Sequence, residues 1–413
     1  MSDRRPLHLF EGFGIELEYM IVDRDTLDVA PIADRLLEAA AGTITGDFED
    51  GPIAWSNELV LHVVELKTNG PAPDLLPLPG QFDASLAKAQ RLLEPLNARL
   101  LPSAMHPWME PARQTKLWPH ETSEVYSAYD RIFDCKGHGW SNLQSCHVNL
   151  PFGNAEEFGR LHAALRVILP LLPALAASSP FVDGRSTGWL DNRLDVYRKN
   201  QARIPSVTGL IVPEAVFTPQ AYRSEILERI WRDAAPHDPD GLLQDEFFNS
   251  RGVIARFVRD AFEIRVLDVQ ETPAADIAIA WITVATLKAM LAGRWLDEAH
   301  LRVFSTERLA ELFLRCARDA DEAIIDDHEW LAAFGVRAQR IRAGDVWRQI
   351  AEQVVDETQE NLPVRSALKT ILERGPLARR ILRVTGLDPT LGTLRAVYGE
   401  LAQCLEHGTQ YGA

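Results

Sequence analysis

Four short segments of this chain carry ionisable side chains where apolar β-strands are otherwise expected. They are GIELEYMIVD (14–23), NELVLHVVELKT (57–68), CHVNL (146–150) and FEIRVLDVQETP (262–273). A charged group in a buried strand is costly unless something cationic or phosphorylated pairs with it. The conflict between strand pattern and charge therefore predicts a polar site on one face of a sheet.

In the first segment, Glu16 and Glu18 alternate with apolar residues, so both carboxylates lie on one face of the expected strand. Two like charges at that spacing repel unless a metal ion or a cationic ligand lies over them. Taken alone, the pair also fits a strand face in contact with solvent.

The second segment carries Glu58 and Glu65 within a long strand predicted over residues 55–67. Residues seven apart cannot share a face of a regular strand, so either Glu58 precedes the strand proper or a bulge intervenes. Glu65 interrupts the apolar face formed by Leu61 and Val63, which makes it the more informative of the two. A surface position for Glu58 is the alternative.

In the third segment, His147 and Asn149 project to the same face. An imidazole and an amide are suited to bind a divalent metal ion or a phosphate oxygen, and Asn149 is thus a candidate nucleotide contact. A hydrogen-bonded histidine in the core is the alternative interpretation.

The fourth segment places Glu263 and Arg265 on one face, where a simple salt bridge is the alternative to a site. Arg256 precedes them and is suited to contact phosphate or a substrate carboxylate through its planar guanidinium group.

An irregular stretch rich in Arg, Asn and Tyr runs from residue 183 to 209. Arg185, Arg193 and Tyr197 are its candidate substrate-binding residues. An anion-binding loop and a solvated run of charge fit this pattern equally well.

The formal charge of −16 argues against a nucleic-acid partner, because phosphate contacts need a basic face. An acidic protein that uses ATP requires a divalent cation to offset repulsion. Four widely spaced cysteines, with no CxxC pair, indicate a reducing compartment, and no apolar signal segment is seen at residues 1–14. We therefore expect a cytoplasmic protein that acts on small molecules without a membrane, and a homodimer is left open.

The order of predicted elements gives the fold class. Strands and helices mix up to about residue 275, and almost everything after it has helical period, which is an α+β pattern. We expect a catalytic domain over 1–275 and a helical C-terminal region over 276–413 packed on the same domain. Residues 109–143 are expected to form a loop-rich excursion that covers a site. No glycine-rich phosphate loop of the GxGxxG or GxxxxGK[ST] type is present.

In this order the segments resemble the glutamate–cysteine ligase family, which shares the catalytic fold of glutamine synthetase. GIELE resembles its first GxExE strand, VEL (64–66) its second acidic strand and HVN its HxN strand. LLPALAASSPFVDGR resembles its helix and SSPfxxG turn, and FEIRVLD its final ExRxLD strand. The resemblance covers roughly residues 11–276 and implies a curved, mainly antiparallel sheet that holds ATP and Mg2+ on its concave face, with flanking helices.

The resemblance also implies individual roles. Arg265 would lie near the transferred phosphoryl group, Glu263 would share in catalysis, and Glu16, Glu18, Asn149 and Arg256 would bind the nucleotide and its metal. The implied metal ligands are Glu16, Glu58 and Glu65 for one ion and Glu18, His147 and Glu263 for a second. Arg193 matches a substrate-loop arginine by its position after the SSPfxxG turn.

The chemistry that this combination predicts is ATP-dependent joining of a carboxylate to an amine through an acyl phosphate. The resemblance implies the γ-carboxylate of glutamate, with cysteine or a related compound as the amine. Two alternatives remain open: a phosphotransferase on the same sheet, and a non-catalytic relative that binds nucleotide or amino acid.

Overall fold

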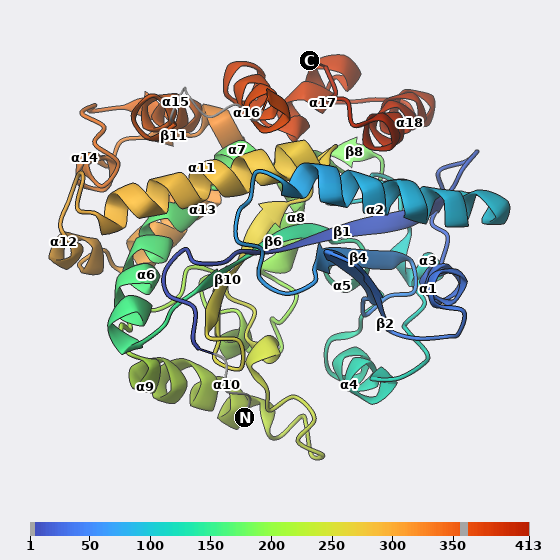
Figure 1. The fold of residues 1–413 in the computed structure, drawn as a ribbon, viewed down its shortest axis with the longest axis horizontal. Coiled ribbons are helices and arrows are strands. Elements are labelled where there is room, and N and C mark those ends of the chain that lie inside the picture. The colour runs from blue at the N-terminus through green and yellow to red at the C-terminus, as the bar shows by residue number, and fades with distance from the viewer. Residues whose placement is uncertain (1–4, 356–361, 413) are drawn as a thin grey trace.

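The computed structural model describes residues 5–355 and 362–412. Its centre is a curved, antiparallel sheet in the order β2-β3-β4-β1-β6-β10-β9, with β5 paired to the last residues of β1 (Figure 1). The strands are β1 (Gly14–Asp23), β2 (Asp47–Asp50), β3 (Ile53–Asn57), β4 (Val63–Thr68), β5 (Ala98–Leu101), β6 (Ser145–Pro151), β9 (Val253–Arg256) and β10 (Ala261–Asp268). The expected α+β class and mainly antiparallel sheet are confirmed.

The central strand β1 follows its alternating sequence. Ile15, Leu17, Tyr19 and Ile21 have no exposed surface, and they belong to the main hydrophobic core. The alternate residues, which include Glu16 and Glu18, face the other side of the sheet. One face of the sheet is therefore core and the other carries ionisable groups.

Helices cover the apolar face. α2 (Leu78–Leu93) and α11 (Pro273–Leu291) lie side by side over it, and α6 (Ala155–Ile168) packs against α11 (Figure 1). Thr272 caps α11 by accepting a hydrogen bond from the Ala275 amide, with Pro273 at the first helical position. α11 is long and apolar enough to cross a membrane, but 72% of its most apolar window is buried within the protein, as in a core helix.

The apolar run at residues 167–182 also lies in the core. α6 ends at Ile168, a 3-10 turn (Leu169–Leu171) follows, and α7 (Pro173–Ala176) completes the run. Proline cannot donate the helical hydrogen bond, which explains the break at Pro170.

The prediction of one continuous strand over residues 55–67 is wrong. Residues 53–68 form a hairpin, β3 and β4, and residues 58–62 connect the two strands. The connection is anchored by the buried His62, whose Nε2 lies 2.6 Å from the Ser141 carbonyl oxygen. Glu58 therefore lies in the connection that precedes β4, whereas Glu65 lies within β4, and no bulge is needed to bring them together.

The excursion at residues 109–143 is more helical than expected. It contains α3 (Pro111–Gln114), α4 (Ser123–Phe133) and α5 (His138–Ser141). α4 and α5 lie on the polar side of the sheet, together with α8 (Asn192–Tyr197) and the 3-10 turn Glu246–Phe248.

The C-terminal helices lie beyond α11 (Figure 1). Among them, α16 packs directly on α11 and α15 packs on both. The remaining elements are α1 (Ala33–Ala41), α9 (Pro219–Tyr222), α10 (Glu228–Ala234), α12 (Glu298–Arg302), α13 (Thr306–Asp319), α14 (His328–Ala332), α15 (Ala343–Val354), α16 (Leu362–Arg374), α17 (Leu377–Thr385), α18 (Leu391–His407) and the small pairs β7 (Phe181–Val182) with β8 (Arg185–Ser186) and β11 (Ile324–Ile325) with β12 (Ile341–Arg342).

Candidate active site

Strand register gathers the predicted ionisable residues on the polar face of the sheet. Glu18 lies directly across from Glu65, and Glu16 lies across from His147. One strand further, Glu263 lies across from Asn149. Four adjacent strands, β4, β1, β6 and β10, therefore deliver their polar side chains to one place.

These side chains form two groups in which the potential metal-ligating atoms all lie within 4.8 Å of one another. One group is Glu16, His147 and Glu263, and the other is Glu18, Glu65 and His147. Carboxylate oxygens are the ligands that Mg2+ prefers, so both groups fit a divalent cation of this kind.

The side chains that lie close together in the structure are grouped differently from the ligands that the resemblance implies. The resemblance joins Glu16 to Glu65 and Glu18 to Glu263, whereas the structure groups Glu16 with Glu263 and Glu18 with Glu65. The reason is register: β4 meets β1 with Glu65 opposite Glu18, and β6 brings His147 opposite Glu16.

Glu58 lies in the connection after β3 and lines the same cavity as Glu18. Burial raises the pKa of Glu58 well above its usual value, and the charges of Glu65 and Glu18 raise it further. Glu58 is thus close enough to extend the group of Glu18 and Glu65.

The carboxylates of the site differ in their ionisation. Burial and the charge of Glu16 raise the pKa of Glu65 to about 7. Burial opposes ionisation of Glu16, but its hydrogen bond with His147 and the charges of His147 and Arg259 bring its pKa far below the usual range. Burial would lower the pKa of His147, yet the bond to Glu16 and the charge of Glu18 raise it overall. Such crowding of like charges is relieved by a bound cation.

Cationic side chains pair with three of these carboxylates outside the cavity that Glu18 lines. Arg256 Nη1 lies 2.9 Å from Glu263 Oε2, Arg259 Nη1 lies 3.3 Å from Glu16 Oε1, and Lys67 Nζ lies 3.1 Å from Glu65 Oε1. The part of the site outside the cavity is therefore rich in cationic groups that bind phosphate.

Asn149 leaves one buried atom without a partner. Its Nδ2 donates to Glu16 Oε1 at 3.1 Å, while its Oδ1 has no hydrogen-bond partner among the residues that the structure describes. Gly14 makes room for this side chain, because a Cβ at Gly14 would lie 2.9 Å from the Cβ of Asn149. An orphaned amide oxygen beside carboxylates fits the oxygen-rich ligand set of a hydrated Mg2+ ion.

At the Glu18 end, the site opens into a cavity of about 230 Å³. Aromatic side chains from α4, α5 and the turn at 246–248 form its wall: Tyr126, Tyr129, Trp140 and Phe247. Among its polar lining atoms, the Tyr197 hydroxyl, the Trp140 Nε1 and the Nε atoms of Arg193 and Arg265 have no hydrogen-bond partner. All of these are donors, so the cavity fits a ligand that carries acceptors, such as a carboxylate.

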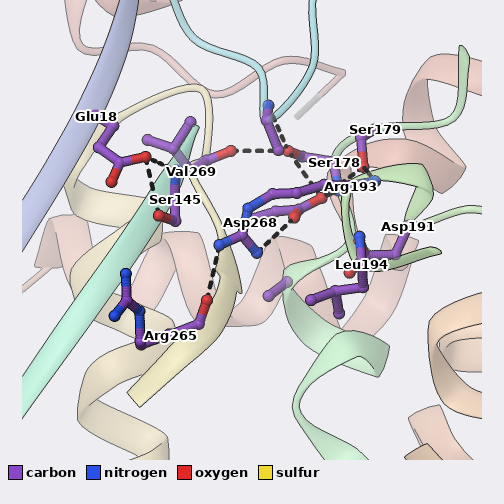
Figure 2. A network of polar contacts seen from close by, with 12 residues as sticks. Glu18, Ser145, Ser178, Ser179, Asp191, Arg193, Leu194, Arg265, Asp268 and Val269 are labelled. Atoms are coloured by element: carbon purple, nitrogen blue, oxygen red, sulfur yellow. Dashed lines mark hydrogen bonds and ion pairs between the residues drawn. The ribbon is translucent and has the colours of Figure 1, made fainter. Parts of the chain in front are cut away.

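Arg193 is held at the cavity by a buried network (Figure 2). Its Nη1 lies 3.3 Å from Asp268 Oδ1, and its Nη2 donates to the Arg265 carbonyl oxygen at 2.7 Å. Asp268 in turn accepts hydrogen bonds from the Ser178 amide and the Ser179 hydroxyl. The SSPF turn, through Ser178 and Ser179, and the end of β10, through Asp268, therefore hold Arg193 in place.

Arg185 is not brought to the site. It is exposed on β8, in a hairpin whose turn at Asp183 and Gly184 has positive φ, and it does not line the cavity. The amide of Gly184 donates to the Pro107 carbonyl oxygen. The expectation of substrate contact by Arg185 is therefore not supported by its position, whereas Arg193 and Tyr197 both line the cavity.

Sequence reasoning missed several site residues. The strand predicted over residues 55–67 ends at Lys67, and the two-residue spacing of Lys67 from Glu65 places both side chains on the same face. Ser145 donates to Glu18 from its amide at 2.7 Å and from its hydroxyl at 2.9 Å. The aromatic wall of the cavity had no sequence signal beyond the aromatic content of residues 109–143.

Two solved structures share this architecture. A glutamate–cysteine ligase from Francisella tularensis in complex with AMP superposes with a TM-score of 0.59 over 95% of this chain and 88% of its own, at 12% identity. A bifunctional glutathione synthetase from Pasteurella multocida gives a TM-score of 0.56 over 97% of this chain and 53% of its own, at 14% identity. At these identities the likeness establishes the fold.

Relatives in sequence extend the comparison. A protein of Herpetosiphon aurantiacus provisionally named glutamate–cysteine ligase 2 is 23% identical, over 97% of this chain and 95% of its own. An uncharacterised protein of Archaeoglobus fulgidus is 35% identical over 67% of this chain and 74% of its own.

The family match and the named relative place this protein in the class of carboxylate–amine ligases. Within that class, the chain belongs to the glutamate–cysteine ligase family 2, whose model matches residues 12–402.

Proposed function

We propose that this protein is an ATP-dependent ligase that activates a substrate carboxylate as an acyl phosphate and transfers the acyl group to an amine. The observation that supports it most is the contiguity of two clusters. Six ionisable groups that suit Mg2+ lie directly beside a cavity whose unpaired polar groups are donors. A metal-dependent phosphoryl transfer to a bound carboxylate needs these two features side by side.

The residues have distinct tasks in this mechanism. Glu16, His147 and Glu263 would hold one Mg2+, and Glu18 and Glu65, with Glu58 nearby, would hold another. When bound, Mg2+ neutralises the phosphate oxygens of ATP and leaves the γ-phosphorus open to attack.

On the cavity side, Tyr197 and Arg193 bind and orient the substrate carboxylates. Arg265, whose Nε lies 3.5 Å from Glu263 Oε1, stabilises charge on the transferred phosphoryl group. The attacking carboxylate oxygen forms the bond to the γ-phosphorus as ADP leaves. The amine nitrogen then attacks the acyl carbon, phosphate leaves, and the amine loses a proton. The aromatic wall excludes water, which would otherwise hydrolyse the acyl phosphate.

For the substrates, we propose the γ-carboxylate of glutamate as donor and cysteine or a related amine as acceptor, in line with the family. The test measures ADP release with Mg2+ and ATP while glutamate is paired with a panel of amines, and mass spectrometry identifies the amide. We expect ADP release that depends on both the carboxylate and the amine.

Controls that omit either substrate, and the Glu263→Gln variant, define the background of this assay. ADP and a phosphorylated product formed without any amine would instead indicate a phosphotransferase. Nucleotide binding without turnover on any pair would contradict the ligase proposal.

A further inference from the structure

Lys67, Arg256 and Arg259 each neutralise a carboxylate that is also a candidate metal ligand. Lys67 holds Glu65, Arg256 holds Glu263, and Arg259 holds Glu16, at the distances given above. Lys67 also donates to Ser56 Oγ at 2.7 Å, and its partner across the strand pair is Glu16. None of these three side chains lines the substrate cavity.

A metal ion and a lysine or arginine side chain cannot easily share one carboxylate. A metal ion that binds Glu65 places two positive charges beside the ammonium group of Lys67, and repulsion in a partly buried site is strong. Metal binding therefore favours departure of the lysine unless an anion arrives with the metal.

The side chains of Lys67 and Arg259 are exposed enough to change partners. The side chain of Lys67 keeps 27% of its surface exposed and that of Arg259 keeps 50%. Both are long and flexible, so a small rotation moves their charged heads by several ångströms without disturbing the strand.

We propose that Lys67, assisted by Arg259, acts as an exchangeable counter-ion that pairs with the metal-ligand carboxylates before the nucleotide binds and with the phosphates of ATP afterwards. The proposal rests on the nucleotide use proposed above. Lys67 is then a positioning and binding residue that makes Mg2+ and nucleotide binding depend on each other.

This exchange has a consequence for binding equilibria. A residue that competes with Mg2+ for Glu65 but assists the nucleotide creates positive coupling between the two ligands. Its removal must strengthen the binding of Mg2+ alone and weaken the binding of the Mg2+–nucleotide complex. A merely structural salt bridge does not produce these opposite signs.

The experiment is isothermal titration calorimetry of the full chain with Mg2+ alone, and with adenylyl imidodiphosphate, a non-hydrolysable ATP analogue, in the presence of Mg2+. For Lys67→Met we expect the analogue to bind about tenfold more weakly and Mg2+ alone to bind about threefold more tightly. Lys67→Arg keeps the charge, and we expect it to keep the affinity for the analogue within about threefold of the original protein.

Lys88→Met is the matched control. Lys88 is similarly exposed, and its Nζ lies 2.7 Å from Asp50 Oδ1, outside the acidic groups. We expect both affinities to stay unchanged in this variant. Arg259→Gln, on an exposed side chain, gives a second test with the same pair of opposite shifts, and it decides the matter should Lys67→Met fail to fold.

Unchanged affinity for the analogue in Lys67→Met, or weaker binding of Mg2+ alone, would overturn the counter-ion role while leaving the ligase proposal in place. Failure of the unmodified protein to bind the analogue at all would overturn both proposals.

Discussion

The two faces of the central sheet come from the same strands, yet they obey different rules. On one face of β1, apolar side chains with no exposed surface pack under α2 and α11. On the other face, Glu16, Glu18 and their neighbours are nearly as buried but carry charge. The apolar face is explained by folding, whereas burial of several carboxylates opposes folding and is the expected cost of the proposed ligand site.

The largest effect should follow from a change on the polar face that preserves shape. We expect Glu16→Gln to lower turnover by about a thousandfold or more, because it removes a charged metal ligand. Its melting temperature should fall only modestly, because His147 and Arg259 stabilise the charged form of Glu16 in the folded protein. Assays of ADP release together with circular dichroism check both parts, and turnover like that of the original protein would refute the assignment of Glu16.

The adjacent residue on the opposite face should behave in the reverse way. We expect Leu17→Ala to lower the free energy of unfolding by about 3 kcal/mol, since it leaves a cavity in the core. Urea denaturation measures this loss. Turnover per folded molecule should change by less than about twofold, and a large catalytic defect would show that the two faces are not independent.

The dependence of stability on pH separates the faces further. The pKa of Glu65 is about 7 in the folded protein and near 4.5 when unfolded, because burial and Glu16 disfavour its charge. Stability linked to this group is therefore full below pH 4.5 and is lost as the pH rises through 7. We expect metal-free Glu65→Gln to match the original protein at pH 4.5 and to exceed its free energy of unfolding by about 2 kcal/mol at pH 8.

Urea denaturation in a chelating buffer at the two pH values tests this expectation. A gain at pH 8 that is no larger than the gain at pH 4.5 would contradict the raised pKa of Glu65.

The smallest effects concern the substrate cavity. Tyr197→Phe removes an unpaired buried hydroxyl, and we expect the KM of the carboxylate substrate to rise about tenfold with little change in kcat. Arg185→Ala serves as the comparison, and its exposed hairpin position predicts no change. Steady-state kinetics of both variants test the placement, which an equal defect in Arg185→Ala would contradict.

The sequence predicted the parts of the site that strand periodicity controls. Glu16 and Glu18 share a face because side chains alternate along a strand, and His147 with Asn149 follows the same rule. Pairing between strands is not encoded in one strand, so the exchange of Glu16 and Glu18 between the two ligand groups required the register. The α+β class and the family were also accessible from the order of the motifs.

Other features were lost because they depend on packing at a distance. The turn that places Glu58 beside Glu18 is fixed by His62 and Ser141, which are 79 residues apart. The wall of the cavity depends on how α4 and α5 dock over the sheet. Arg185 and Arg193 belong to the same irregular stretch of the sequence, but of the two only Arg193 contacts a buried aspartate in the described structure.

One contact joins the helical region to the strand that carries Arg265. Just beyond β10, Glu271 is fully buried and lies 2.5 Å from Arg380 of α17, whose Nη1 also donates to the Tyr411 carbonyl oxygen. A cut near residue 275 would separate α11 from α2 and α6, on which it packs. It would also leave the carboxylate of Glu271 buried without its counter-ion Arg380. The boundary visible in the sequence is therefore no place to cut a fragment for expression, and heating should melt both portions in a single step.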